Sequence, residues 1–382
     1  MREHPFTTFV LRTLVALLPV LLFVGLYLAI DPFRVVHRYD GISIAAGDTL
    51  ERMPNKRYVA IEGLKHYAPE HHYDSFIFGS SISSNFTAAA WKRHLPDSAS
   101  VYHFTAGAET LSGIRDELRY LLAGGYTVRH VMLVMEAEMF HRPTRYEEMP
   151  FVPHYDVSPA ISWLHFHRLH FNAFRDPYMF LYQLHPTRWL ADKLLEDGKM
   201  TTVPSGRDEV TNEDSSYGLD TLIANNGDRY YQERIPWLID MQPQPNPMPL
   251  DIDETNSGVL REIAAMLRDH GVDDYIVIVP PRFRSQPLSP IDHMALCEIM
   301  GQQHVNDFSA DSVLIHDLHS YYDGVHILTH RCTEMIDRCY NKAPQSTLIT
   351  TTRNQEPRTK NQELKTKDQE LKTKDQELGT RN

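Results

Sequence analysis

Between residues 70 and 345, short apolar runs alternate with helical segments, and this alternation constrains the fold more than any other feature of the chain. Strands are expected at residues 76–78, 100–104, 130–135, 275–279 and 312–318, of which 76–78 is a short, continuous apolar run. Helical segments are expected at residues 109–123, 258–269 and 328–340. Short strands that are apolar throughout are typical of parallel sheets that helices cover on both faces. The pattern therefore predicts an α/β fold, a three-layer α/β/α sandwich with a parallel five-stranded sheet, whose functional loops lie at the carboxyl ends of the strands.

The N-terminus carries an uncharged apolar run at residues 13–30. Its length of about 18 residues is close to the minimum for a helix that crosses a bilayer. The run is longer than a usual signal-peptide core, and Asp31-Pro32 follows it where a cleavage site of small residues would be needed. We therefore expect residues 1–30 to form a transmembrane signal anchor; a buried core helix is the alternative.

The charges that flank this run bear on its orientation. Arg2 and Arg12 precede it, which favours a cytoplasmic N-terminus, whereas Arg34 and Arg38 on the far side act against that orientation. We expect a single-pass protein of the bacterial inner (cytoplasmic) membrane, with the folded domain on the periplasmic side. The membrane itself is then the first expected partner.

Composition excludes several classes of function. The formal net charge of −12 and the lack of a basic stripe argue against nucleic acid as a partner. The 21 histidines are scattered without a ligand set, so we expect no metal and no other cofactor. Cys332 and Cys339 would lie about 10 Å apart on one helix, too far for a disulfide. A pairing of Cys297 with either of them stays open.

Two short motifs carry groups that could do chemistry together. Residues 75–81 form an apolar strand that breaks at Gly79 and leads into two serines, and residues 323–326 read Asp-Gly-Val-His. A serine nucleophile needs a base within hydrogen-bond reach and a carboxylate that orients the base. Ser81, His326 and Asp323 could supply these three groups. The alternative is structural: the serines cap the next helix, and Asp323 makes an Asx-turn.

The two motifs resemble those of the SGNH (GDSL-type) hydrolase superfamily, over roughly residues 70–340. The resemblance implies that Gly79-Ser80-Ser81 is the first family block, with Ser81 as nucleophile, and that Asp323 and His326 complete a catalytic triad. Ser80 stands where the family usually has Asp. The Gly-Ser-Ser form is similar to that of membrane-anchored relatives that move acyl groups on envelope polymers.

The resemblance also implies an oxyanion hole. Two of its donors would be the backbone N–H groups of Ser81 and Gly107. The family's third donor is an Asn, and Glu136 occupies that region here. Arg282 and Arg284, which follow the run at residues 275–279, are candidate contacts for an anionic or sugar substrate, with a solvated turn as the alternative.

The remaining segments complete the expected domain plan. Residues 31–70 are expected to be a stalk, and residues 71–345 an SGNH-like domain with a helical and irregular insertion at 140–250. The aromatic-rich residues 158–195 are either a helical insertion that packs on the sheet or a membrane-proximal or acyl-chain-binding cap over the site. Residues 196–250, rich in Pro and Asn, are expected to form irregular loops.

The C-terminal tail repeats a heptad. Residues 359–365 recur at 366–372 and again at 373–379, with a single leucine in each copy. A coiled coil needs two apolar positions per heptad. We therefore expect residues 346–382 to be a disordered repeat without chemistry.

Taken with the resemblance, these features predict a serine acyl esterase or O-acyltransferase that acts on a cell-envelope polysaccharide through an acyl-serine intermediate. Its partners would be an acylated polysaccharide or acyl donor and a membrane acyltransferase. The alternative is a catalytically inactive envelope protein of the same fold that binds polysaccharide or an acyltransferase. Ser80 and Glu136, at positions that matter in the family, favour this alternative.

Overall fold

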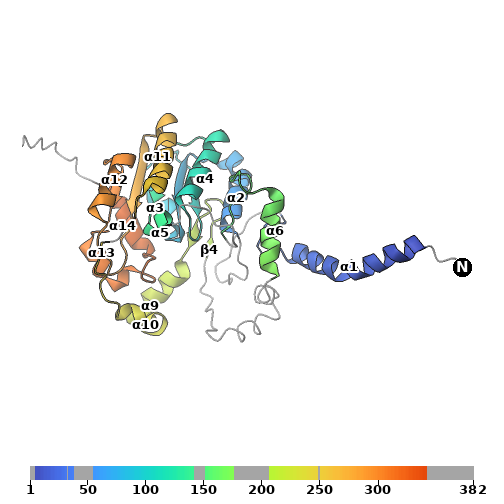
Figure 1. Ribbon diagram of the computed structural model, residues 1–382. Coiled ribbons are helices and arrows are strands. Elements are labelled where there is room, and N and C mark those ends of the chain that lie inside the picture. The colour runs from blue at the N-terminus through green and yellow to red at the C-terminus, as the bar shows by residue number, and fades with distance from the viewer. Residues whose placement is uncertain are drawn as a thin grey trace, which may run out of the picture. The chain divides into compact units, whose positions relative to one another are not determined.

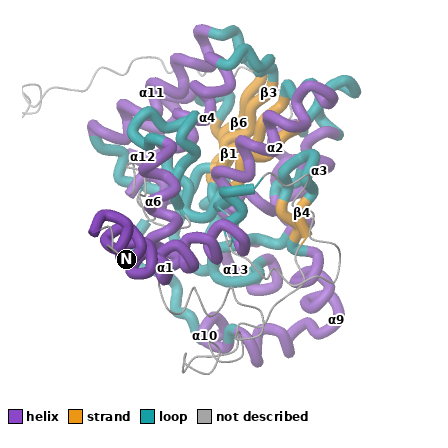
Figure 2. Tube along the Cα trace, turned by 90° about the vertical axis from the view of Figure 1, so that its right-hand side faces the viewer, coloured by secondary structure: helices purple, strands orange, loops and turns teal. Residues whose placement is uncertain are grey.

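The computed structural model describes residues 5–31, 33–37, 55–141, 151–175, 206–247 and 250–341. The expected disordered tail lies outside these residues. The described chain is α/β, and its main sheet has five strands in the order β2-β1-β3-β6-β7, all paired in parallel (Figures 1 and 2). These strands are β1 (Ser75–Gly79), β2 (Val101–Thr105), β3 (His130–Val134), β6 (Asp274–Val279) and β7 (Val305–Asp307). The predicted parallel five-stranded sheet is therefore confirmed.

Helices separate the strands along the chain. Those before the insertion are α1 (Pro5–Ile30), α2 (Lys56–His71), the 3₁₀ helix η1 (Ser81–Asn85), α3 (Ala88–Lys92), α4 (Leu111–Ala123) and α5 (Ala137–His141). Those after it are α11 (Glu254–Asp269), α12 (Pro290–Met300), α13 (Ser312–His316), the 3₁₀ helix η3 (Leu318–Ser320) and α14 (Thr329–Tyr340). The three helices expected from the sequence are present as α4, α11 and α14.

The expected fifth strand was placed wrongly. Residues 312–318 form α13 and the start of η3, because Asp311 accepts hydrogen bonds from the N–H groups of Val313 and Leu314, both at 3.0 Å, and so caps a helix. The actual fifth strand, β7, has only three residues. A short apolar run does not reveal by periodicity whether it is a strand or a helical turn.

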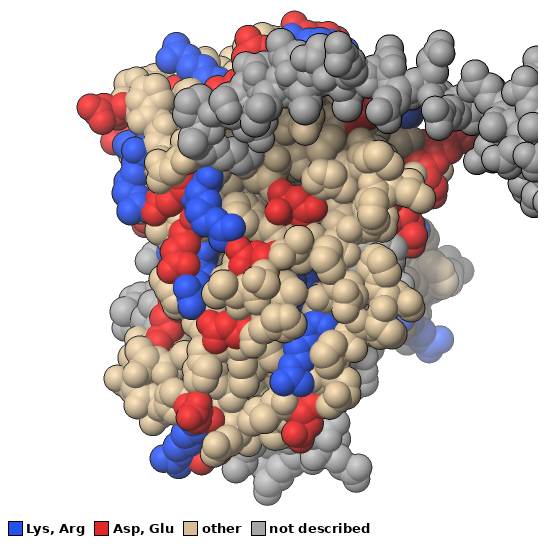
Figure 3. Space-filling model, turned by 90° about the vertical axis from the view of Figure 1, so that its left-hand side faces the viewer, with Lys and Arg blue, Asp and Glu red and all other residues tan. Residues whose placement is uncertain are grey.

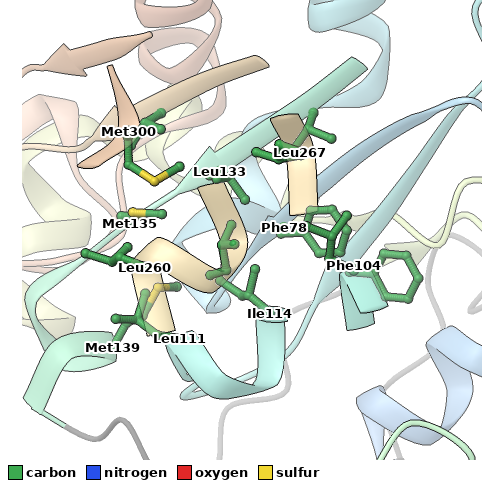
Figure 4. Close-up of a cluster of buried hydrophobic side chains, with 14 of the residues drawn as sticks. Phe78, Phe104, Leu111, Ile114, Leu133, Met135, Met139, Leu260, Leu267 and Met300 are labelled. Carbon is green, nitrogen blue, oxygen red and sulfur yellow. The ribbon is translucent and has the colours of Figure 1, made fainter. Parts of the chain in front are cut away.

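The sheet is buried by two separate groups of apolar side chains. Phe76 and Phe78 of β1 belong to one group, and Ile77 between them belongs to the other. The strands β3 and β6 alternate in the same way, and α4, α11 and α12 contribute to the first group, α3 and α14 to the second. Figure 4 shows the first group, in which Phe78 and Phe104 stack with ring centroids 5.2 Å apart. Each buried side chain of this size contributes about 1.5–3 kcal/mol of transfer free energy.

Part of the expected stalk belongs to the folded domain. Residues 56–71 form α2, whose Ala60, Ile61 and Leu64 lie in the first apolar group beside β2. Asn55 caps this helix by accepting a hydrogen bond from the N–H of Tyr58 at 3.1 Å. The stalk prediction was therefore wrong for residues 56–70, because the apolar side chains of this segment pack against the sheet.

The described parts of the insertion contain more regular structure than expected. They hold α6 (Trp163–Phe174), the antiparallel pair β4 (Gly206–Arg207) and β5 (Asp214–Ser215), α9 (Tyr217–Arg234) and α10 (Pro236–Ile239). The prediction of irregular loops over 196–250 was therefore wrong for α9 and α10. Within α9, Gly227 has φ 34° and ψ −118°, so the helix is kinked at the Asn-Asn-Gly sequence that suggested a turn. Tyr178, Phe180, Tyr182 and Trp189 lie outside the described residues.

The N-terminal helix α1 includes a segment, Thr8–Ile30, that is long and apolar enough to cross a membrane. Only 6% of its most apolar window is buried, unlike a core helix. The end of α1 packs against α6: ring centroids are 5.8 Å apart for Phe23 and Phe171, and 5.4 Å for Tyr27 and Phe174. The aromatic residues of α6 thus form a third apolar group with the end of the helix.

Charges of both signs share the surface. Arg331 pairs with Glu334 at 2.9 Å and Arg119 with Glu262 at 3.1 Å. Figure 3 shows one face, on which Lys and Arg side chains lie beside Asp and Glu side chains. Neighbouring opposite charges cancel much of each other's field at the surface. All three cysteines are free thiols, so neither pairing of Cys297 is formed.

Candidate active site

Three neighbouring strands bring their following loops to one edge of the sheet. Gly79, the last residue of β1, is paired with Thr105 on β2 and with Val134 on β3. The residues two positions beyond these strand ends are Ser81, Gly107 and Glu136. Because the strands are parallel, these loops meet at the carboxyl edge, where α/β proteins bind their ligands.

The turn after β1 is tight and fully hydrogen-bonded. A Cβ atom at Gly79 would lie 2.5 Å from Ser83 Cβ and 3.1 Å from the Val134 carbonyl oxygen, so only glycine lets η1 approach β3 this closely. The Ser80 carbonyl accepts hydrogen bonds from the Ser83 N–H at 2.9 Å and from Thr105 Oγ1 at 3.2 Å. These contacts fix Ser81 as the first residue of η1.

Ser81, His326 and Asp323 form a continuous hydrogen-bonded series. His326 Nε2 is 2.8 Å from Ser81 Oγ, and His326 Nδ1 is 2.8 Å from Asp323 Oδ2. The other carboxylate oxygen, Asp323 Oδ1, accepts from the N–H groups of Val325 at 2.8 Å and His326 at 2.7 Å. The Asx-turn expected as an alternative is therefore present together with the carboxylate–imidazole contact, on different oxygens.

The pKa values of this pair shift as a coupled acid and base should. Burial by itself lowers the pKa of His326, but the hydrogen bond and charge of Asp323, together with the charge of Glu136, outweigh it and raise the pKa above its usual value. Burial likewise raises the pKa of Asp323, but its hydrogen bonds and the charge of His326 lower it overall. Asp323 is thus ionised at neutral pH and stabilises a protonated His326.

Helix α9 holds the loop that carries Asp323 and His326. The hydroxyl groups of Tyr231 and Tyr230 donate to the carbonyl oxygens of Tyr321 at 2.8 Å and Tyr322 at 2.9 Å. The Tyr322 hydroxyl in turn donates to Asp220 at the start of α9. The sequence analysis missed these residues. The signal available was the adjacent pair Tyr230-Tyr231 in a stretch without proline between residues 205 and 235.

Glu136 is buried beside the turn that follows β1, and both of its carboxylate oxygens accept hydrogen bonds. Ser80 Oγ donates a hydrogen bond to Glu136 Oε1, and Arg282 donates to Glu136 Oε2 at 3.2 Å. The side chains of Glu136 and Arg282 are 8% and 24% exposed. Ser80 and Glu136, the two residues that depart from the motifs this sequence resembles, are therefore bonded to each other, and Arg282 balances the charge.

A buried ion pair supports the turn that carries Gly107. Arg57 Nε is 2.8 Å from Glu109 Oε2, and both side chains are buried. The same guanidinium donates to the carbonyl oxygens of Gly107 at 3.3 Å and Ala108 at 3.1 Å. With its carbonyl oxygen bound in this way, the turn at Gly107 keeps a fixed conformation next to Ser81's strand.

The two arginines proposed as substrate contacts have different surroundings. Arg282 lies next to Glu136 at the site. The Arg284 guanidinium donates to the Met241 carbonyl oxygen and lies 5.2 Å from the ring centroid of Phe283. The Arg284 backbone, at φ 52°, also donates to the Ile315 carbonyl oxygen at 2.8 Å. Its contacts are those of a residue that organises its own loop.

Comparison with known proteins does not assign this chain to a family. No family model matches the sequence, and no curated protein matches it significantly. The chemistry that the site can perform therefore follows from its geometry. A hydroxyl, an imidazole and a carboxylate in hydrogen-bonded sequence are the groups that activate a serine as a nucleophile, and the structure brings them together from β1 and the loop before α14.

Proposed function

We propose that this protein is a membrane-anchored serine acyl esterase or O-acyltransferase that acts on a cell-envelope polysaccharide. The observation that carries the proposal is the series Ser81–His326–Asp323, with both contacts at 2.8 Å. The proposal includes an SGNH-like three-layer α/β/α sandwich, which the two apolar groups on the sheet support. The resemblance of the Gly-Ser-Ser and Asp-x-x-His motifs supplies the substrate class.

The reaction proceeds in two balanced steps. In the first, Ser81 Oγ attacks the acyl carbonyl carbon while His326 Nε2 takes its proton, and His326 then gives that proton to the departing alcohol oxygen. In the second, water or a sugar hydroxyl attacks the acyl-serine, His326 takes its proton, and Ser81 leaves and regains a proton from His326. Asp323 keeps the tautomer of His326 and stabilises its charged form.

The oxyanion formed in each step is bound by backbone donors. The N–H groups of Ser81, at the start of η1, and of Gly107 are the expected donors, and one such donor is worth about 3–4 kcal/mol. An ionised Glu136 has no proton to donate to the oxyanion. Its two carboxylate oxygens accept hydrogen bonds from Ser80 and Arg282. The positive charge of Arg282 therefore offsets the repulsion that Glu136 would exert on the oxyanion.

Helix α1 supports the proposed cellular setting. We place the protein in the bacterial inner membrane as a single-pass protein with its domain in the periplasm. The packing of α6 against Phe23 and Tyr27 holds the domain close to the end of the anchor, in keeping with the membrane-proximal interpretation of the aromatic insertion. Its partners are an acylated polysaccharide or acyl donor and a membrane acyltransferase that supplies acyl groups.

Acetate release tests the proposal and separates its two forms. The purified full-length protein in detergent is incubated with acetylated glycans, with and without acceptor sugar, and Ser81→Ala serves as the control. Acetate that is released without acceptor identifies an esterase, whereas an acetyl group that appears on the acceptor sugar, without free acetate, identifies a transferase. If wild type and Ser81→Ala behave alike under both conditions, the proposal is wrong.

A second candidate function, a catalytically inactive protein that binds polysaccharide or an acyltransferase, is favoured by Ser80 and Glu136. In the family these positions carry Asp and Asn, and the buried Ser80–Glu136–Arg282 cluster replaces them. The intact contact between His326 and Ser81 counts against this candidate, because an inactive protein has no need of that contact.

A further inference from the structure

A groove of about 540 Å³ adjoins the loop between Asp323 and His326. Gly324, Val325, Phe283 and Arg282 are among its lining residues, and Arg282 donates a hydrogen bond to Glu136. The Phe283 N–H donates to the Gly324 carbonyl oxygen at 3.2 Å, so the groove and the loop carrying the triad form one continuous structure. A ligand in this groove contacts the two residues that separate Asp323 from His326 in the chain.

The other lining residues come from the segment that follows α9. Trp237 is 59% exposed, and a Cβ atom built at Gly324 would lie 3.7 Å from its ring. The segment is held in place because the Gln244 N–H donates to the Arg284 carbonyl oxygen at 2.8 Å, and Gln286 Nε2 donates to the Gln244 carbonyl oxygen at 2.9 Å. Trp237 thus presents an exposed aromatic ring to the groove close to Gly324.

The lining has the chemistry of a sugar site. An exposed indole face offers an apolar platform for the C–H groups of a pyranose ring, and the exposed amides of Gln244 and Asn246 can donate to and accept from hydroxyl groups. A pocket of 300–1,000 Å³ is the usual size for a small ligand. The volume here suits a short stretch of glycan better than a single acetyl group.

Charge decides which kind of glycan fits. Among the described residues that line the groove, Arg282 is the one with a formal charge, and its guanidinium is bound to the Glu136 carboxylate at 3.2 Å. Asp323 adds a negative charge just beyond Gly324. An anionic sugar would therefore find no uncompensated positive charge in the lining and would approach the carboxylate of Asp323.

We propose that this groove is the sugar subsite of the enzyme and takes a neutral glycan segment, with Trp237 as its stacking platform. The inference rests on the proposed function and gives it a substrate class. It also changes the expected role of Arg282, which keeps Glu136 neutralised and does not bind an anionic substrate.

The test measures binding to a protein that cannot react. Full-length Ser81→Ala in nanodiscs is titrated with a neutral tetrasaccharide, chitotetraose, and with an anionic one, tetramannuronate, by saturation-transfer NMR. We expect chitotetraose to bind, and Trp237→Ala to weaken it about tenfold. Trp237→Phe should recover part of the affinity. Trp163→Ala is the matched control, since Trp163 is equally exposed, at 58%, but lies on α6.

Any other result of the titrations contradicts the proposal that this groove binds a neutral glycan. Tighter binding of tetramannuronate contradicts the neutral site, and a failure of both sugars to bind, or equal effects of the two tryptophan variants, removes the groove as the subsite. Fluorophosphonate labelling of Ser81 in the wild-type protein keeps the two proposals apart. Labelling without sugar binding rejects only the groove, whereas an unlabelled wild type rejects the proposed function itself.

Discussion

The two halves of the site are held in different ways. The half that carries the proposed nucleophile, Ser81 and its neighbours, is fixed by strand pairing and by the buried contact of Ser80 with Glu136. The base half stands on a loop, where the side chains of Asp323 and His326 are 41% and 33% exposed, and it depends on α9 for support. The sheet thus determines where the serine lies, and an inserted helix determines whether the base reaches it.

The largest expected effect tests whether the halves work as one unit. Ser81→Ala and His326→Ala should each lower kcat by on the order of 10⁴-fold or more, and the double variant should lose little further. Rates of ester hydrolysis measure this. Additive losses in the double variant would mean that the two residues do not act in one series.

Asp323→Asn tests the base half alone. The change removes the negative charge on Oδ2 and favours the wrong tautomer of His326, so kcat should fall by roughly 10³–10⁴-fold. Unfolding followed by circular dichroism controls for damage to the turn that Oδ1 forms. A well-folded variant with near-normal kcat would show that His326 needs no carboxylate.

The pH dependence of activity tests whether the two halves interact, because the charge of Glu136, like that of Asp323, raises the pKa of His326. The base must be neutral, so activity should fall as pH decreases through a pKa above the usual 6.5. Glu136→Gln lowers that pKa, and the acidic limb of the kcat/KM profile should move to lower pH. Loss of the partner of Arg282 should also cost about 1–2 kcal/mol of stability.

Glu62→Gln is the control for this shift. Glu62 is a partly exposed carboxylate on α2 that contacts His154 at 3.1 Å, away from the site. It should change stability without moving the pH profile. An unchanged pH profile in Glu136→Gln would show that the charge of Glu136 does not affect the pKa of His326.

The smallest effect concerns the support by α9. Tyr230→Phe removes the hydrogen bond to the Tyr322 carbonyl oxygen and should cost about 1 kcal/mol of stability. It should also lower kcat a few-fold, because the loop carrying Asp323 loosens. Tyr102→Phe, which removes a 2.6 Å bond to the Ala60 carbonyl oxygen, should cost similar stability and leave kcat unchanged. Equal kcat values in the two variants would show that the hydrogen bond from α9 does not position the loop that carries Asp323.

The same contrast explains how much the sequence could predict. The strands β1, β2, β3 and β6 are rich in apolar residues, and each was expected within about one residue of its place. Gly79 and the Asp-x-x-His motif then placed Ser81, Asp323 and His326 at one edge of the sheet. Local signals were sufficient because Ser81 directly follows the turn after β1, and Asp323 and His326 belong to one four-residue motif.

The parts that were missed depend on contacts between distant residues. The hydrogen bond between Arg282 and Glu136 joins residues 146 positions apart, and no local sequence pattern predicts it. Helix α9 was hidden because Asn225, Asn226 and Gly227 suggest a turn, whereas packing of Tyr231 on the loop at Tyr321 keeps the kinked segment helical. Tertiary contacts overrode the local preference there.

Reaction with a fluorophosphonate, read by intact mass, tests the central claim most directly. The probe adds covalently to a serine that a base activates, whatever the natural substrate is. Full-length wild-type protein in detergent should gain a single adduct, and Ser81→Ala and His326→Ala should gain none. No adduct on folded wild type, or an adduct that persists in Ser81→Ala, would contradict the assignment of Ser81 as an activated nucleophile.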